Sequence, residues 1–209
     1  MYFEYSHLFF NQFLTKYMLS FDSKLCIITH RNKVIQGGRS MEKMSFEVRK
    51  AIPNDIEEIR ILARESFKMY TENAGITELV SPLEETYEDV KKAIETTEVF
   101  VALSNEEVIG SVRIEIKPDN TAYLSRFGVS ASHQNNGIGK ILMNAVYNSM
   151  RELGITCLYL HTASRMFSLI RFYYGRGFYI ESTTNDRGYI RALLCKEYEL
   201  ESDCKERAV

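Results

Sequence analysis

Two glycines, Gly137 and Gly139, stand at the start of an apolar, helix-like stripe and follow a strand-like run over 122–129. A strand, a glycine turn and a helix in this order point unpaired backbone N–H groups, and the positive end of the helix dipole, at one spot. Such a spot binds anions, most often phosphate. Because glycine has no Cβ, a ligand can approach this backbone closely. The sequence therefore predicts a phosphate-binding turn.

Two common phosphate loops do not fit these residues. A Walker loop would need glycine at Gln134 and a hydroxyl side chain at Ile141, so its magnesium ligand is missing. The dinucleotide fingerprint begins correctly at Gly137 but has Leu142 where its third glycine belongs. What remains is a Gln-x-x-Gly-x-Gly pattern after a strand.

This pattern, from Gln134 to Gly139, resembles the acetyl-coenzyme A loop of the GNAT superfamily of N-acetyltransferases. A second segment, 171–178, reads Arg-Phe-Tyr-Tyr-Gly-Arg-Gly-Phe and is similar to the family's Tyr-x-x-x-Gly-Phe segment. Two motifs in the expected elements are far more specific than either alone. The resemblance covers residues 46–200.

The elements that would position these motifs follow from hydrophobic periodicity and from glycine and proline signals. Asn54 and Glu57 form a capping-box-like pair that opens the first helix, and Gly154 is placed to end the third. The predicted strands are 46–52, 99–103, 108–117, 122–129, 157–161, 178–183 and 189–200, and the later helices are 82–96, 138–153 and 165–174. The order β-α-α-β-β-β-α-β-α-β-β is that of the GNAT fold. The resemblance thus implies an α/β (α+β) architecture with a mixed central sheet of about seven strands flanked by about four helices.

The resemblance also implies which residues bind the donor. The loop residues expected to anchor the pyrophosphate of coenzyme A are Gln134, Asn135, Asn136, Gly137, Ile138, Gly139 and Lys140. The backbone of Phe127, Gly128 and Val129 is expected to hold the pantetheine arm and the acetyl carbonyl, where this strand splays from the next. Gly128 suits such a distortion, since a glycine inside a strand often marks a bulge or a close backbone approach.

For the chemistry, the resemblance places Tyr173 as the general acid that protonates the departing thiolate. The alternative is that Tyr173 only continues an apolar helix face with Met166 and Leu169. The general base departs from the family's pattern, because the strand leading into the loop carries Ser125 and Arg126 in place of a glutamate. The family's asparagine, seven residues before the acid, is Met166 in this chain.

Two residues remain candidates for the base. Glu115 could act through water, although its alternating strand pattern equally fits a solvated sheet face. His161 ends a predicted strand and could also serve. An amine can otherwise arrive already deprotonated through a chain of water molecules.

Composition restricts the partners. A net charge of −2 over 209 residues gives no footprint for nucleic acid or an anionic membrane. No apolar run approaches the roughly 18 residues that a membrane-spanning helix needs. The four cysteines are widely spaced, which argues against a structural metal site and for a reducing compartment. We expect a cytoplasmic protein without a metal, a nucleic-acid partner or a membrane partner.

Residues 1–43 differ from the rest, since eight of the first 21 residues are Phe or Tyr. Gly37-Gly38, just before Met41, is what a ribosome-binding sequence spells when it is translated in frame. This segment is therefore predicted to be an upstream mis-start, with synthesis beginning at Met41 or Met44. The alternative is a genuine, poorly ordered extension. Residues 44–209 are predicted to form the N-acetyltransferase domain.

The predicted function is acetyl-CoA-dependent transfer of an acetyl group to a primary amine, on a small molecule or a protein, by direct attack on the thioester. Two alternatives are an enzyme with another acyl donor or a hydroxyl acceptor, and a non-catalytic acetyl-CoA-binding sensor. The acceptor is expected near 70–81 and the final hairpin. Acidic residues there would attract a cationic acceptor such as a polyamine, or form a solvated helix start: Glu72, Glu78, Glu84 and Glu85. Pairing of sheet edges or C-termini would allow a homodimer.

Overall fold

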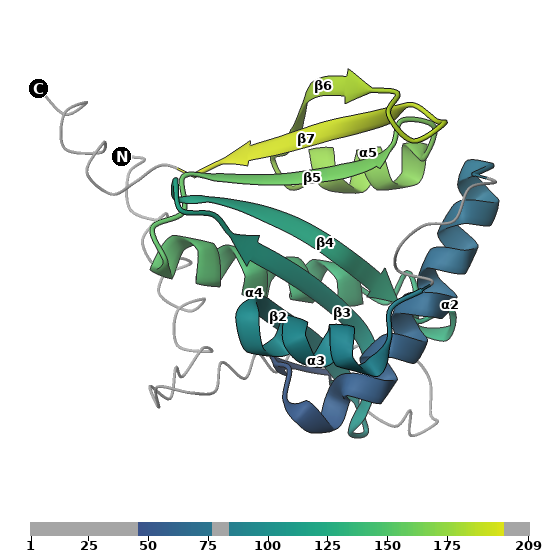
Figure 1. Cartoon of the computed structure of the whole chain (residues 1–209), viewed down its shortest axis with the longest axis vertical. Helices are drawn as coiled ribbons and strands as arrows, with labels where there is room; N and C mark the ends of the chain where they lie inside the picture. Colours follow the sequence, from purple (N-terminus) through teal and green to yellow (C-terminus); the bar gives the residue numbers. More distant parts are fainter. Residues whose placement is uncertain (1–45, 77–83, 199–209) are drawn as a thin grey trace, which may run out of the picture.

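The computed structural model describes residues 46–76 and 84–198 (Figure 1). The predicted extension, 1–43, and Glu78 lie outside the described residues. The elements are β1 (Phe46–Lys50), η1 (Pro53–Asp55), α2 (Ile56–Ala74), α3 (Tyr87–Thr96), β2 (Glu98–Ser104), β3 (Glu107–Ile116), β4 (Thr121–Val129), η3 (Ala131–His133), α4 (Ile138–Glu152), β5 (Cys157–Ala163), α5 (Phe167–Tyr174), β6 (Tyr179–Thr184) and β7 (Arg191–Glu197). None of the helices in these ranges is long and apolar enough to cross a membrane.

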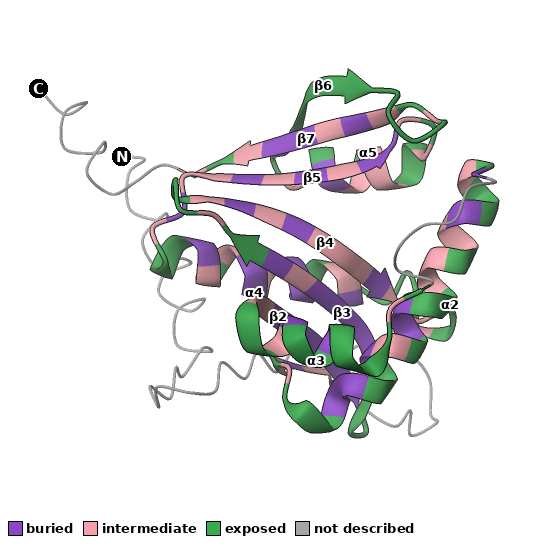
Figure 2. Ribbon diagram, viewed as in Figure 1, coloured by how far each residue is buried: buried purple, intermediate pink, exposed green. Residues whose placement is uncertain are grey.

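The strands form one 7-stranded sheet in the order β1-β2-β3-β4-β5-β7-β6. All neighbours pair antiparallel except β4 and β5, which run parallel. The predicted element order and mixed sheet are confirmed. At the edge of the sheet, every residue of β6 is exposed (Figure 2). The homodimer expected from sheet-edge pairing stays a prediction.

The two faces of the sheet carry separate apolar clusters, and β2 contributes to both because its side chains alternate. Val99 and Val101 pack on the α2–α3 side with Ile56. Phe100 and Ala102 belong to the larger cluster that contains the apolar face of α4. Figure 1 shows α2 and α3 in front of the sheet, with α4 behind it. The helix periodicity seen in the sequence thus places each helix on one face of the sheet.

Strands β4 and β5 separate along their length. They pair only at Thr121–Cys157, Ala122–Leu158 and Tyr123–Tyr159. Beyond Tyr123 the two strands diverge, while β5 continues to pair with β7 as far as Ala163 (Figure 1). The edge of β4 that faces β5 therefore has no strand partner over its second half.

A bulge lies in that second half of β4. Ser111 pairs with Gly128 and Arg113 with Ser125, so two residues of β4, Arg126 and Phe127, oppose one residue of β3. Arg126 has a φ of 53°, in the left-handed region that glycine prefers.

Of the two features that Gly128 predicts, a bulge or a close backbone approach, the structure has the close approach at Gly128 and the bulge just before it. A Cβ on Gly128 would lie 2.9 Å from the Oγ of Ser66. Glycine is required there because α2 approaches β4 closely, and the bulge itself falls at Arg126 and Phe127. The bulge and the glycine allow β4 to separate from β5 while α2 stays packed against β4.

Two predicted helix starts are also wrong. The pair Asn54 and Glu57 does not cap α2; instead the Asp55 carboxylate accepts the N–H of Ile52 at 2.8 Å and pairs with Arg49 at 2.6 Å. Helix α3 begins at Tyr87, because the Thr86 side chain accepts the N–H of Asp89 at 3.2 Å and caps it. Pro82, the predicted start, lies outside the described residues.

Candidate active site

A cleft of about 720 Å³ opens where β4 and β5 separate. Its walls come from α2, β4, the loop before α4, β5, α5 and the β6–β7 hairpin. The predicted site residues that line it are Phe127, Gly128, Val129, Gln134, Asn135, Gly137, Ile138, Gly139, Lys140 and Tyr173. Asn136 is exposed and does not line the cleft. The structure thus brings together two motifs that are distant in the sequence.

The loop before α4 has the geometry that its glycines predict. Gly137 has a φ of 82° at the N-cap position of the helix, and Asn135 also has a positive φ of 64°. A Cβ on Gly139 would lie 3.1 Å from the Phe127 ring and 3.3 Å from the Phe172 ring, so a larger residue here would require these rings to shift. The amides of Ile138 and Gly139 begin the helix and have no backbone acceptor in the described part of the chain. These N–H groups are available to an anion.

Gln134 ties this loop to the strand before it. Its side-chain amide donates to the Val129 carbonyl at 3.2 Å and lies 3.8 Å from the sulfur of Met69 on α2. The side chain of Lys140, at the first turn of α4, is exposed and has no acidic partner among the residues that the structure describes. A positive charge therefore stands beside the free amides.

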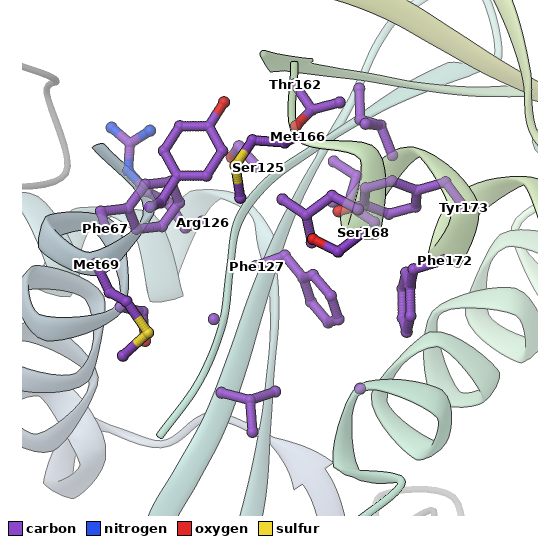
Figure 3. Close-up of a pocket in the computed structure, with 18 of the residues that line it drawn as sticks. Phe67, Met69, Ser125, Arg126, Phe127, Thr162, Met166, Ser168, Phe172 and Tyr173 are labelled. Carbon is purple, nitrogen blue, oxygen red and sulfur yellow. The ribbon is translucent and has the colours of Figure 1, made fainter. Parts of the chain in front are cut away.

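Tyr173 comes from α5 and lies in an aromatic cluster (Figure 3). Its ring centroid is 6.3 Å from that of Phe127, 5.2 Å from Phe172 and 5.5 Å from Phe178. Only 4% of Tyr173 is exposed, and this burial raises the pKa of its phenol well above 10.0. The phenol is consequently protonated at neutral pH and can donate a proton.

Sequence reasoning missed Thr162. Its side chain lines the cleft near Met166 (Figure 3), yet its hydroxyl is buried and has no hydrogen-bond partner among the described residues. Leu158 and Leu160 precede it at the same spacing on β5 and belong to the core. A hydroxyl that continues an apolar strand face is the signal that could have revealed it. A buried polar group without a partner is costly, so its partner is expected from a ligand.

His161 precedes Thr162 on β5, so its side chain points to the opposite face of the sheet. There its Nδ1 lies 2.9 Å from the Oη of Tyr123. Burial lowers the pKa of His161, and the charge of Arg191 lowers it further, so its imidazole is neutral at pH 7. Near the end of β5, the N–H of Ala163 donates to the Oη of Tyr70 at 2.7 Å. This hydrogen bond connects α2 to the side of the cleft that β5 forms.

The predicted acidic candidates do not reach the cleft. Glu115 is exposed and pairs with Lys117. The Glu85 carboxylate lies between two arginines, 2.8 Å from Arg113 and 3.0 Å from Arg126. The two guanidinium groups therefore compensate its charge. Of the candidate bases, His161 lines the cleft.

Within the described ranges, no group of three or more His, Cys, Asp or Glu residues could hold a metal ion.

Comparisons with known proteins agree with this geometry. A model of the acetyltransferase (GNAT) family matches residues 58–178. The PaiA N-acetyltransferase of Thermoplasma acidophilum, solved in complex with coenzyme A, is 26% identical, with a TM-score of 0.65 over 74% of this chain and 100% of its own. Ard1 of Thermoplasma volcanium is 20% identical, with a TM-score of 0.60 over 74% of this chain and 98% of its own.

The ribosomal-protein-S18-alanine N-acetyltransferase of Escherichia coli shares the fold at 12% identity, with a TM-score of 0.60 over 74% of this chain and 95% of its own. No curated protein sequence matches this chain significantly.

Proposed function

The chain belongs to the acetyltransferase (GNAT) family, and we propose that it transfers the acetyl group of acetyl-CoA to a primary amine by direct attack on the thioester. One observation carries this proposal. The glycine loop, the free edge of β4 and the buried Tyr173 all converge on a single cleft. Acyl transfer needs these three parts: an anchor for the donor, partners for its carbonyl and a proton for its leaving group.

The donor is anchored by the loop before α4. The amides of Asn135 and of residues 137–139 receive the pyrophosphate, Lys140 adds a charge, and Gln134 holds the loop against Val129. Each contact of this kind contributes on the order of 1 kcal/mol. Together with the pantetheine arm, they are sufficient for micromolar binding, which corresponds to about 8 kcal/mol. The coenzyme A in the T. acidophilum relative supports this assignment.

The pantetheine arm lies along the open edge of β4. Phe127, Gly128 and Val129 follow or form the bulge, and their backbone on the β5 side has no strand partner. These groups are placed to hydrogen-bond the arm and to polarise the acetyl carbonyl. Thr162 takes the polar contact that Met166 cannot make, because its buried hydroxyl needs a partner.

Tyr173 donates the proton that the thiolate receives as the C–S bond breaks. A free thiol has a pKa of about 8.5 and a tyrosine of about 10. Burial raises the pKa of Tyr173, and the same dry surroundings raise that of the thiol, so the two stay close enough for transfer. His161 is placed to accept the proton that the amine loses, since it lines the cleft and is neutral.

The test is acetyl-CoA turnover by the full chain with a panel of primary amines. Released thiol is measured in solution, and the N-acetyl product is identified by mass spectrometry. We expect thiol release that depends on the amine. Tight acetyl-CoA binding by calorimetry without turnover of any amine would instead identify a non-catalytic sensor. No binding at all would refute the assignment of the loop.

A further inference from the structure

The charged side chains that line the cleft share one sign. Among the described lining residues there is no aspartate or glutamate, and the cations are Arg126, Lys140, Arg176, Arg187 and Arg191, with the imidazoles of His133 and His161. A cleft built for a polyamine would present carboxylates, because opposite charges at close range favour each other. The described walls present the opposite charge.

Most of these cations already have interaction partners within the protein. Arg126 contacts Glu85, and Arg191 donates three hydrogen bonds to Asp186, at 3.1, 2.8 and 2.5 Å. Arg176 lies 3.5 Å above the Phe172 ring and donates to the Phe172 carbonyl at 2.7 Å. These contacts hold three of the guanidinium groups in the walls. Lys140 lies in the loop that faces the donor.

Arg187 is different. It lies in the turn between β6 and β7, is exposed, lines the cleft, and pairs with no carboxylate in the part of the chain that the structure describes. Burial raises the pKa of Tyr123 and of Tyr189 and lowers that of His161, and the charge of Arg187 acts on all three groups in the lowering direction. The turn that carries Arg187 leads into the end of β7 that pairs with Thr162 and Ala163, so Arg187 lies on the side of the cleft that carries the Tyr123–His161 contact.

This side of the cleft offers the Arg187 guanidinium together with three phenol hydroxyls, those of Tyr70, Tyr123 and Tyr189. Guanidinium and hydroxyl donors together match the oxygens of a carboxylate or a phosphate. The Asp186 carboxylate also acts on His161 and Tyr189, but Arg191 binds it, so the charge left for a ligand in this part of the cleft is that of Arg187. Glu85, which the sequence suggested as an attractor of cationic acceptors, is neutralised behind Arg126.

Building on the proposed function, we infer that the acceptor is an amine that also carries an anionic group, a carboxylate or a phosphate, which Arg187 binds at the β6–β7 turn. The anion positions the molecule so that its amino group reaches the thioester. The surrounding positive charge also favours the neutral, nucleophilic form of that amino group. This effect reduces the demand on a carboxylate base, which the described cleft lacks.

The inference is tested with matched acceptors that differ only in the anion. One arm compares ω-amino acids of increasing chain length with their carboxamides, so that no spacing is assumed. A second arm compares O-phosphoethanolamine with ethanolamine and separates phosphate from carboxylate. Spermidine serves as the polycationic acceptor. For each acceptor, kcat/KM is measured with the full chain by thiol release.

We expect at least one anionic acceptor to exceed its neutral partner about tenfold to hundredfold in kcat/KM, the range for one charge-assisted contact. Arg187→Ala should remove this preference, change kcat/KM of the neutral partner far less than that of the anionic acceptor, and leave the Kd of acetyl-CoA unchanged. Arg187→Lys should restore part of it, and Arg187→Glu should reverse it. The matched control is Arg165→Ala, which removes the same charge from an exposed position outside the cleft.

Three results would overturn the inference. If neutral amines or spermidine reach the same kcat/KM as the anionic acceptors, the acceptor class is wrong and the proposed acetyltransferase function stands. If Arg187→Ala lowers kcat/KM equally for anionic and neutral acceptors, Arg187 does not bind the anion. Failure of every amine, with acetyl-CoA bound, would refute the proposed function and this inference together.

Discussion

The Oη of Tyr123 and the Nδ1 of His161 lie 2.9 Å apart, just where β4 and β5 stop pairing. In the tautomer with its proton on Nδ1, the imidazole donates to Tyr123 and leaves Nε2 able to accept a proton. Tyr123 then acts as a positioning residue that fixes the ring of His161. A contact of this kind orients a general base without changing its charge.

The first prediction concerns this base. Log kcat/KM should rise with slope one while the amine deprotonates, and more steeply below pH 6.5, because the lowered pKa of His161 places its protonation there. His161→Gln should lower kcat about 10²-fold to 10⁴-fold and abolish the steeper segment. Tyr123→Phe should cause a smaller loss, since it removes only the orienting contact. An unchanged profile in His161→Gln would assign deprotonation to water.

Tyr173→Phe tests the leaving-group acid. It should lower kcat by about 10²-fold or more while the Kd of acetyl-CoA changes little, because the ring and its packing remain. Since burial raises the pKa of Tyr173 above 10.0, the wild-type rate should show no downturn caused by this group up to pH 10. Tyr174→Phe is the matched control, as Tyr174 is half-exposed and does not line the cleft. Equal kcat values for Tyr173→Phe and wild type would reduce Tyr173 to a packing residue.

Local signals in the sequence are sufficient for the element order and for the glycine turn before α4. Gly137 is needed for its positive φ, which acts within one turn, whereas the space at Gly139 is limited by the distant Phe127 and Phe172 rings and shows in the chain only as a second glycine. The apolar period of each helix likewise depends only on its own residues. Their positions in the structure follow these signals closely.

Features that depend on strand register were not predictable in this way. The bulge at Arg126 exists only relative to β3, and nothing in its own side chain suggests a positive φ. The surroundings of Glu85 do not show in the sequence, because its partners, Arg113 and Arg126, follow it by 28 and 41 residues. Sequence alone gives the charge of a side chain but not the charges that surround it.

Thr162→Val separates folding from binding. Valine has nearly the same shape and removes a buried hydroxyl that has no partner, so the free energy of unfolding should stay equal or rise by about 1 kcal/mol. If that hydroxyl binds the pantetheine arm, the Kd of acetyl-CoA should rise about fivefold to tenfold. Urea denaturation and calorimetry measure the two quantities. A loss of stability without loss of affinity would show that the hydroxyl has a structural partner.

The last prediction concerns the backbone of Arg126. Arg126→Gly and Arg126→Ala both remove the guanidinium that contacts Glu85, so they differ only in what the main chain can adopt. At a φ of 53° alanine costs about 1–2 kcal/mol, whereas glycine loses about 0.5–1 kcal/mol through the entropy of the unfolded chain. The glycine variant should therefore be the more stable by roughly 0.5–1 kcal/mol in urea denaturation. It should also keep the higher acetyl-CoA affinity, because the bulge that frees the edge of β4 persists. If the alanine variant were equally stable and bound acetyl-CoA equally well, the left-handed residue would not be what holds β4 open.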